Sequence, residues 1–234
     1  MASTIIARPR QFVISLGGSI IVPPEGIDWR LLKKFRALIK EQIRLQKRFF
    51  IIAGGGATSR RYLEAADKIV KVSDEDRDWL GIHTTRLNAH LLRTVFYDVA
   101  YPRVIKNPTY RLKIKNRVII GCGWKPGWST DYVAVLIAQE YNVKTIINLS
   151  NIDYVYDKDP KLYLEAKKLK QVSWDDFRRI VGNKWSPGLN APFDPIASQK
   201  AQQLGLRVVL LNGKKLVRLK NFLTNGRVEG TIIE

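Results

Sequence analysis

A polar segment that directly follows an apolar strand constrains this chain most. Residues 145–147 are β-branched and predict a buried strand, and residues 148–160 (NLSNIDYVYDKDP) are rich in polar groups. Such a segment is typical of a loop at the carboxyl end of a parallel sheet, where open α/β sheets bind ligands. Three carboxylates could hold a metal or a ribose and two rings could stack on a base: Asp153, Asp157 and Asp159, with Tyr154 or Tyr156. A solvated turn is the alternative interpretation.

Two further predicted strands run directly into glycine. Residues 11–16 are followed by Gly17-Gly18-Ser19, and residues 48–53 by Gly54-Gly55-Gly56 and then a helix. Glycine lets backbone N–H groups approach phosphate oxygens, and a helix N-terminus adds a positive dipole. Arg60 lies about one turn into that helix and could bind a phosphate. The alternative is a pair of loops that only require close packing.

A third predicted strand, residues 117–120, ends in GCGWKPGWSTD (residues 121–131). Ser129 or Thr130 can cap the next helix, with Asp131 in its first turn. Trp124 and Trp128 could be hydrophobic cover, so we assign them no base stacking from the residues alone. The glycines fit neither a Walker A loop nor the G-x-G-x-x-G fingerprint, which disfavours a P-loop kinase and a Rossmann dehydrogenase.

The remaining pattern predicts further helices and strands. N-cap signals stand at Asp28, Ser173 and Asp194, and an acidic run at 73–78 opens a long helix. We expect helices after these caps, a long helix from about 73 to 97, short strands in 101–116, a loop at 182–193, a strand at 207–211, a helix at 216–223 and a closing strand at 230–233.

The net charge of +19 attracts polyanions such as nucleic acid, phosphorylated ligands or anionic lipid. The cations are spread over the whole sequence, and no zinc-finger, RRM or KH signature is present. We therefore favour a generally basic surface over nucleic-acid binding.

Composition also predicts a compartment. Cys122 is the single cysteine, which excludes an internal disulfide and is compatible with a reducing cytoplasm. No apolar run approaches the roughly 20 residues of a membrane span, and the first residues show no secretory signal. His83 and His90 share a helix face without a third ligand, so we expect hydrogen bonding or a subunit contact there and no protein metal site.

Six ordered motifs carry a family resemblance: LGGS, GGG with Arg60, TRLNA, PGWSTD, NLSNIDYVYDKDP and GLNAPFDPIAS. Together they resemble the amino-acid-kinase superfamily, and most closely the archaeal-type uridylate (UMP) kinases. The resemblance implies one α/β domain over residues 1–234, a three-layer α/β/α sandwich with a mostly parallel central sheet. Residues 1–140 would bind the acceptor and residues 141–234 would bind ATP.

The resemblance also implies site residues. Those expected at ATP are Gly18, Ser19, Gly56, Arg60, Ser150, Asn151, Tyr156 and Asp159. Those expected at UMP are Gly55, Asp78, Trp124, Lys125, Pro126, Gly127, Trp128, Ser129 and Thr130. The residues expected to organise catalysis are Arg60, Asp131 and Asp153. ATP would bring Mg²⁺, and relatives of this kind commonly form hexamers built from dimers, so we expect a homo-oligomer.

Two positions depart from the family pattern. Many members carry a lysine where this chain has Ser15, and another directly after the triple glycine, where it has Ala57. The missing positive charge would come from elsewhere, and the candidates are Arg60, Lys125, Lys158 and Lys184. We expect Arg60 to carry most of this role. The alternatives are a kinase of the same fold with another small acceptor, and an inactive nucleotide- or RNA-binding regulator.

Overall fold

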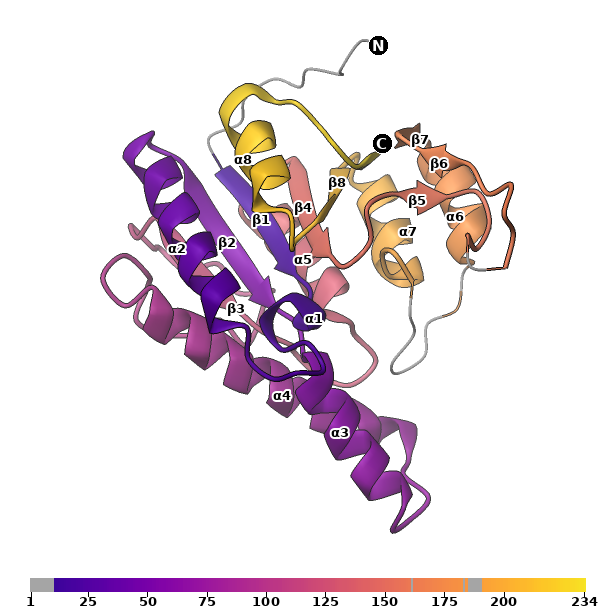
Figure 1. Ribbon diagram of the computed structural model, residues 1–234. Coiled ribbons are helices and arrows are strands. Elements are labelled where there is room, and N and C mark those ends of the chain that lie inside the picture. Colours follow the sequence, from indigo (N-terminus) through magenta and orange to yellow (C-terminus); the bar gives the residue numbers. More distant parts are fainter. Residues whose placement is uncertain (1–10, 161, 183, 185–190) are drawn as a thin grey trace.

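The computed structural model describes residues 11–160, 162–182, 184 and 191–234. Its central sheet has seven strands in the order β3-β2-β1-β4-β8-β9-β7 (Figure 1). These strands are β1 Gln11–Leu16, β2 Arg48–Ala53, β3 Val118–Gly121, β4 Thr145–Ser150, β7 Gln171–Val172, β8 Arg207–Asn212 and β9 Thr231–Ile233. All neighbours pair in parallel except β8 and β9. The mostly parallel α/β/α sandwich predicted from the sequence is confirmed.

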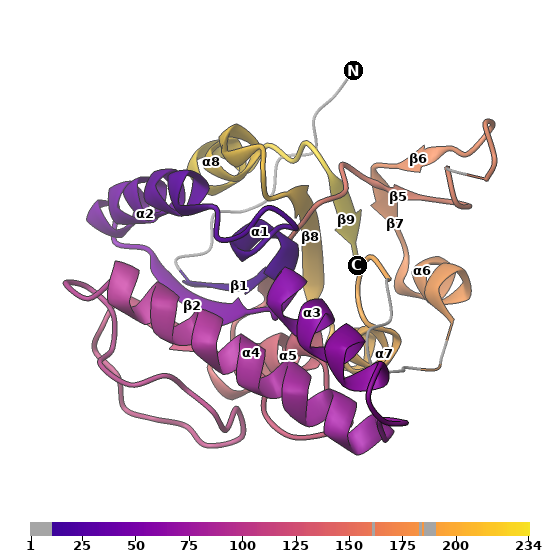
Figure 2. The same cartoon turned by 60° about the horizontal axis from the view of Figure 1, so that its bottom comes forward.

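Helices cover both faces of the sheet (Figure 2). One hydrophobic cluster joins the sheet to α1, α2, α4 and α8, and the other joins it to α5, α6 and α7. The helices are α1 Gly18–Ile21, α2 Trp29–Arg44, α3 Gly56–Asp67, α4 Asp74–Val95, α5 Thr130–Glu140, α6 Trp174–Val181, α7 Pro195–Gln203 and α8 Leu216–Asn225. Within the described residues, no helix is both long and apolar enough to cross a membrane.

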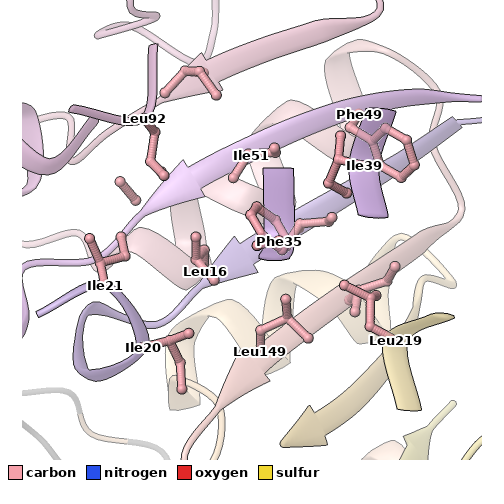
Figure 3. Close-up of a cluster of buried hydrophobic side chains, with 14 of the residues drawn as sticks. Leu16, Ile20, Ile21, Phe35, Ile39, Phe49, Ile51, Leu92, Leu149 and Leu219 are labelled. Atoms are coloured by element: carbon pink, nitrogen blue, oxygen red, sulfur yellow. The ribbon is translucent and has the colours of Figure 1, made fainter. Parts of the chain in front are cut away.

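The strands form because they are apolar on both sides. In β1, Phe12, Ile14 and Leu16 face one cluster and Val13 faces the other. A parallel sheet that is covered on both faces requires this near-continuous run of large apolar residues. Figure 3 shows how Leu16 packs in the first cluster among side chains from the helices and the neighbouring strands.

The caps predicted at Asp28, Ser129, Ser173 and Asp194 are confirmed, and Ser73 adds an unpredicted cap at the start of α4. The side chains of Asp28, Ser73, Ser129, Ser173 and Asp194 each accept a hydrogen bond from a backbone N–H in the first turn of the following helix. A cap of this kind satisfies an otherwise unpaired donor and typically contributes ~1 kcal/mol.

Two local features differ from the sequence predictions. The short strands expected in 101–116 are wrong: this segment makes one isolated bridge, Ile105 with Gly121, and Ala100 just before it bridges Val118. Its apolar residues are fixed by packing rather than by strand pairing. The hairpin of β5 Val155–Tyr156 and β6 Lys168–Leu169 was not predicted. Most of the loop expected at 182–193 lies outside the described residues.

The turns after β1 and β2 touch each other through their backbones. A Cβ on Gly18 would lie 1.9 Å from the Gly56 nitrogen, and one on Gly54 would lie 2.4 Å from the Gly18 nitrogen. Gly56 also has φ +69, a left-handed conformation that glycine adopts without strain. These glycines are therefore required by the fold itself.

Gly18→Ala should destabilise the protein severely. The new methyl group meets backbone atoms on a neighbouring strand's turn, so it cannot be relieved by a side-chain rotation. We expect a loss of at least about 3 kcal/mol in the free energy of unfolding, measured by urea denaturation. The matched control is Gly81→Ala in α4, where the nearest atom is Ser59 Oγ at 3.7 Å. A Gly18→Ala variant as stable as that control would contradict the close packing.

Candidate active site

The turns that follow the parallel strands enclose a cavity of about 650 Å³. It lies at the carboxyl edge of the sheet, beside the N-termini of α3 and α5, the edge toward which β1 and β2 point in Figure 1. Its lining includes ten predicted site residues: Gly18, Ser19, Gly55, Gly56, Arg60, Asp78, Trp128, Ser129, Thr130 and Asn151. The fold therefore gathers most predicted phosphate and acceptor contacts around one cavity.

A buried amide supports the triple-glycine turn. Asn88 Nδ2 on α4 donates to the Gly54 carbonyl at 2.8 Å and to the Gly55 carbonyl at 3.0 Å. Because Asn88 binds both carbonyls, the orientation of these two peptide groups in the turn is fixed. Sequence reasoning did not single out Asn88, although a buried asparagine within a helix needs hydrogen-bond partners and is a usable signal.

The loop between β3 and α5 is tied to α4 at three points. The Gly127 N–H donates to Asp78 Oδ2 at 2.6 Å, and the Gly123 N–H donates to Thr85 Oγ1 at 2.9 Å. Arg86 donates to the Trp124 carbonyl at 3.2 Å. Burial raises the pKa of Asp78, and the hydrogen bond from Gly127 opposes that rise. Asp78 therefore holds the acceptor loop as well as lining the cavity.

Stacked aromatic rings form one wall of this loop. Trp128 stacks on Tyr132 with ring centroids 4.2 Å apart, and Trp124 lies nearly parallel to Trp128 at 6.5 Å. Lys125 is exposed, with its ammonium 4.4 Å from the Trp124 ring centroid. Of the residues predicted at UMP, Trp124, Lys125, Pro126 and Gly127 are not among those that line the cavity.

Asp131 lies in the first turn of α5 and is hydrogen-bonded to Ser15 of β1. Ser15 Oγ donates to Asp131 Oδ1 at 2.7 Å, and Asn148 Nδ2 donates to the same oxygen at 3.2 Å. The Asp194 N–H donates to Oδ2 at 3.2 Å. Desolvation is the largest effect on the carboxyl and raises the pKa of Asp131 to about 6, although the Ser15 hydrogen bond opposes it. The nearby Asp194 charge adds to the rise.

Asp153 has a different environment from Asp131. Its carboxylate contacts Arg218 at 2.6 Å and Lys215 at 2.8 Å, and it accepts a hydrogen bond from Asn212. The hydrogen bond from Lys215 is the largest effect and lowers the pKa of Asp153. Asp153 is not among the residues that line the cavity. The structure therefore shows Asp153 as the centre of an ion-pair cluster beside α8.

The predicted ATP residues of the C-terminal half divide into two groups. Asn151 lines the cavity and Ser150 ends β4, where its carbonyl accepts from the Gly213 N–H at 2.8 Å. Tyr156 pairs with Lys168 in the β5–β6 hairpin, and Asp159 begins a turn in the same hairpin. In Figure 1 this hairpin lies at the upper right whereas α3 extends to the bottom, and neither residue is among those that line the cavity. Tyr156 and Asp159 are thus not brought to the cavity.

The structure distinguishes the four candidate cations, because Lys125, Lys158 and Lys184 are not among the residues that line the cavity. Arg60 lines the cavity and is exposed. Lys158 pairs with Glu165 at 3.0 Å, and Lys125 lies over Trp124. Among the described residues that line the cavity, Arg60 and Arg77 are the cations, and Arg77 already pairs with Asp67 at 2.5 Å. Arg60 is therefore the cation available to a ligand in this cavity.

Glycine turns and two helix N-termini around one cavity, at the carboxyl edge of a parallel sheet, define an α/β protein that binds phosphorylated ligands. The chain belongs to the amino acid kinase family, whose sequence profile matches residues 10–212. The uridylate kinase of Methanospirillum hungatei is 31% identical over 224 residues, covering 94% of this chain and 93% of the relative. The uridylate kinase of Pyrococcus abyssi is 31% identical over 228 residues, with 96% and 99% covered.

Solved structures agree with this family. The crystal structure of the Archaeoglobus fulgidus uridylate kinase superposes with a TM-score of 0.79 at 27% identity, covering 95% of this chain and 99% of that one. A Bacillus anthracis UMP kinase superposes with a TM-score of 0.78 at 22% identity, covering 97% of each chain. The second match supports the fold alone.

Asp131→Asn should change how stability depends on pH. The pKa of Asp131 is about 6 in the folded protein, whereas an unfolded aspartate titrates near about 3.9. The native state therefore binds this proton more tightly, so the stabilising contribution is present below about pH 4 and is lost as the pH rises through about 6. Relative to the variant, wild type should lose up to about 3 kcal/mol over this range in urea unfolding.

The control for this titration is Asp153→Asn. Because Lys215 and Arg218 lower the pKa of Asp153, its contribution is present at neutral pH and is lost as the pH falls. The two variants should thus differ from wild type with opposite pH trends. A pH-independent difference for Asp131→Asn would show that its carboxyl is not shifted upward.

Proposed function

We propose that this protein is a UMP kinase that transfers the γ-phosphoryl group of ATP to UMP, giving UDP and ADP in pyrimidine nucleotide synthesis. The observation that carries the proposal is the contact between the turns after β1 and β2, because it brings backbone donors from both turns to one cavity. The nearly full-length similarity to uridylate kinases supports the choice of substrate.

The geometry suits phosphoryl transfer. This reaction needs two anionic groups held in line and their charge neutralised, with little covalent work by the protein. In the proposed arrangement, Gly18 and Ser19 hold phosphates of ATP, and Gly55 holds the UMP phosphate. Gly56 and Arg60 neutralise the group in transfer from the N-terminus of α3. Asp78 and the loop ending at Thr130 enclose the acceptor.

Asp131 acts through its neighbours in this proposal. Its oxygens accept hydrogen bonds from Ser15, Asn148 and the Asp194 N–H, which join β1, β4 and α7 at the start of α5. In this role Asp131 is a positioning residue that sets the N-terminus of α5 against the end of β1. Its raised pKa leaves part of it protonated near pH 6.

Mg²⁺ would arrive with ATP and supply charge neutralisation at the phosphates. Among the described residues, no three His, Cys, Asp or Glu side chains gather into a metal-binding group. Backbone N–H groups and Arg60 dominate the donor set, and these cannot ligate a cation. The residues present fit a metal held mainly by phosphate oxygens, with no protein cage around it.

We also propose a cytoplasmic homo-oligomer that uses the outer face of α4. Leu87 is 64% exposed and Trp79 36% exposed on this helix, and His83 and His90 are exposed between and beyond them. The ring centroids of Trp79 and His83 lie 6.0 Å apart, so two of these four exposed side chains form an aromatic pair on the helix surface. Exposed apolar side chains that share a helix face are typical of a subunit contact.

An acceptor panel tests the substrate. We expect ADP release from Mg-ATP with UMP, and far slower release with CMP, dCMP, AMP, GMP, carbamate and acetylglutamate. Turnover with a different acceptor would keep the fold and replace the substrate. Nucleotide binding without any turnover would instead support the regulatory alternative, which Ser15 and Ala57 motivate.

Arg60→Ala should lower kcat/KM for UMP by about 100-fold, because it removes a cationic donor from the centre of charge transfer. Steady-state ADP release measures this. The matched control is Arg61→Ala, since the Arg61 guanidinium is directed to the Pro24 carbonyl and does not line the cavity. Turnover of Arg60→Ala within a few-fold of wild type, as in the control, would assign the role to another cation.

A further inference from the structure

The segment between α4 and β3 concentrates positive charge. Residues 103–117 contain six Lys or Arg and no Asp or Glu. All six are exposed: Arg103, Lys106, Arg111, Lys113, Lys115 and Arg117. These six cations fall within 15 consecutive residues, although the lysines and arginines as a whole are spread over the chain. We call these six residues the basic strip.

The core holds the second half of the strip in place. Ile114 is buried and Leu112 packs against the same cluster, so the residues between and beside them face outward. The Leu112 N–H donates to Tyr141 Oη at 3.0 Å, and Tyr141 Oη donates to the Leu112 carbonyl at 3.3 Å. Exposure alternates along this extended segment, which places its four cations on one side. The charges are pre-positioned rather than carried on a free tail.

A seventh cation lies directly behind the strip. Arg48 donates to the carbonyls of Ile114 at 2.6 Å and Asn116 at 3.2 Å, so it joins β2 to this segment without neutralising it. Burial lowers the pKa of Arg48, and the positive charges of Arg117 and Arg111 lower it further. Among the described residues, neither Arg48 nor any cation of the strip forms an ion pair. A polyanion would relieve this like-charge crowding.

The second half of the strip, Arg111 to Arg117, lies at the opposite edge of the sheet from the cavity, whereas Lys106 follows Ile105, which bridges Gly121 at the carboxyl end of β3. Arg48 begins β2 and Arg117 directly precedes β3, whereas the glycine turns follow the other ends of the strands. Figure 2 shows this segment on the side of the molecule where α4 ends, away from α3. A ligand on the strip would therefore leave the cavity open.

We infer that the basic strip binds the phosphate backbone of single-stranded nucleic acid without sequence specificity. From Arg111 to Arg117 an extended chain spans about 20 Å, which fits several phosphates in a row better than one small anion. Tyr110, 67% exposed, stands at one end and can stack on a base. The exposed side of the strip otherwise lacks the large apolar residues that anchor proteins in a membrane surface.

The test is fluorescence anisotropy with a labelled single-stranded RNA of mixed sequence over a salt series, with saturating UMP and ADP to block the cavity. Combining Arg111→Ala, Lys113→Ala and Lys115→Ala should weaken RNA binding at least about tenfold. The slope of log affinity against log salt concentration should become shallower by about 2, because each of the three lost phosphate contacts contributes about 0.7. The same variant should keep wild-type UMP phosphorylation, so binding and catalysis are read separately.

The matched control removes three exposed cations from α2, by Lys33→Ala, Lys34→Ala and Arg44→Ala. It lowers the net charge equally, and RNA affinity should stay close to wild type. Equal losses in both triple variants would overturn the inference, because they would show attraction to diffuse charge. No RNA binding by wild type would also overturn it, as would stronger binding to phosphatidylserine vesicles that the strip variant abolishes.

Discussion

The direct contact between two glycine turns is the constraint on which the rest of the site depends. Neighbouring parallel strands place their carboxyl ends side by side, and Gly18 and Gly56 allow the following turns to touch without intervening side chains. A side chain at Gly18 would separate the turns and thereby split the cavity. The same absence of side chains leaves backbone N–H groups as donors, so one packing requirement provides both stability and a phosphate-binding surface.

Ser15, which lies in β1 just before the first glycine turn, affects the charge of the site through Asp131. The family resemblance implies a lysine at this position in many members, but here the Ser15 hydroxyl donates to Asp131. A lysine would neutralise Asp131, whereas the hydroxyl leaves a desolvated carboxyl whose pKa rises to about 6. Positive charge must then approach from the cavity side, where Arg60 stands on α3. The absence of a lysine at Ser15 is thus compatible with a greater dependence of phosphoryl transfer on Arg60.

What the sequence could predict follows from the range of each interaction. Caps such as Ser129 and Asp194 act within one helical turn, and glycine after a strand is an equally local signal, so these were identified correctly. The catalytic role expected of Asp153 stays a prediction, and its ion-pair partners Lys215 and Arg218 were not predicted because they are more than 60 positions away in the chain. Tertiary partners of this kind leave no periodic trace, and neither do the bridges that replace the strands expected in 101–116.

The distribution of charge over the surface could not be predicted from the sequence either. A net charge of +19 says nothing about where the field is strongest, because it depends on which cations have acidic neighbours. Arg36 and Lys40 share Asp98, and Lys215 and Arg218 share Asp153, so each of these groups of cations is partly neutralised by an acidic neighbour. The basic strip has no such balance within the described residues, and its burial pattern prevents the cations from turning inward. One group of cations without acidic partners, Arg111 to Arg117, therefore lies at the amino edge of the sheet, while the cavity at the carboxyl edge relies on backbone donors and Arg60.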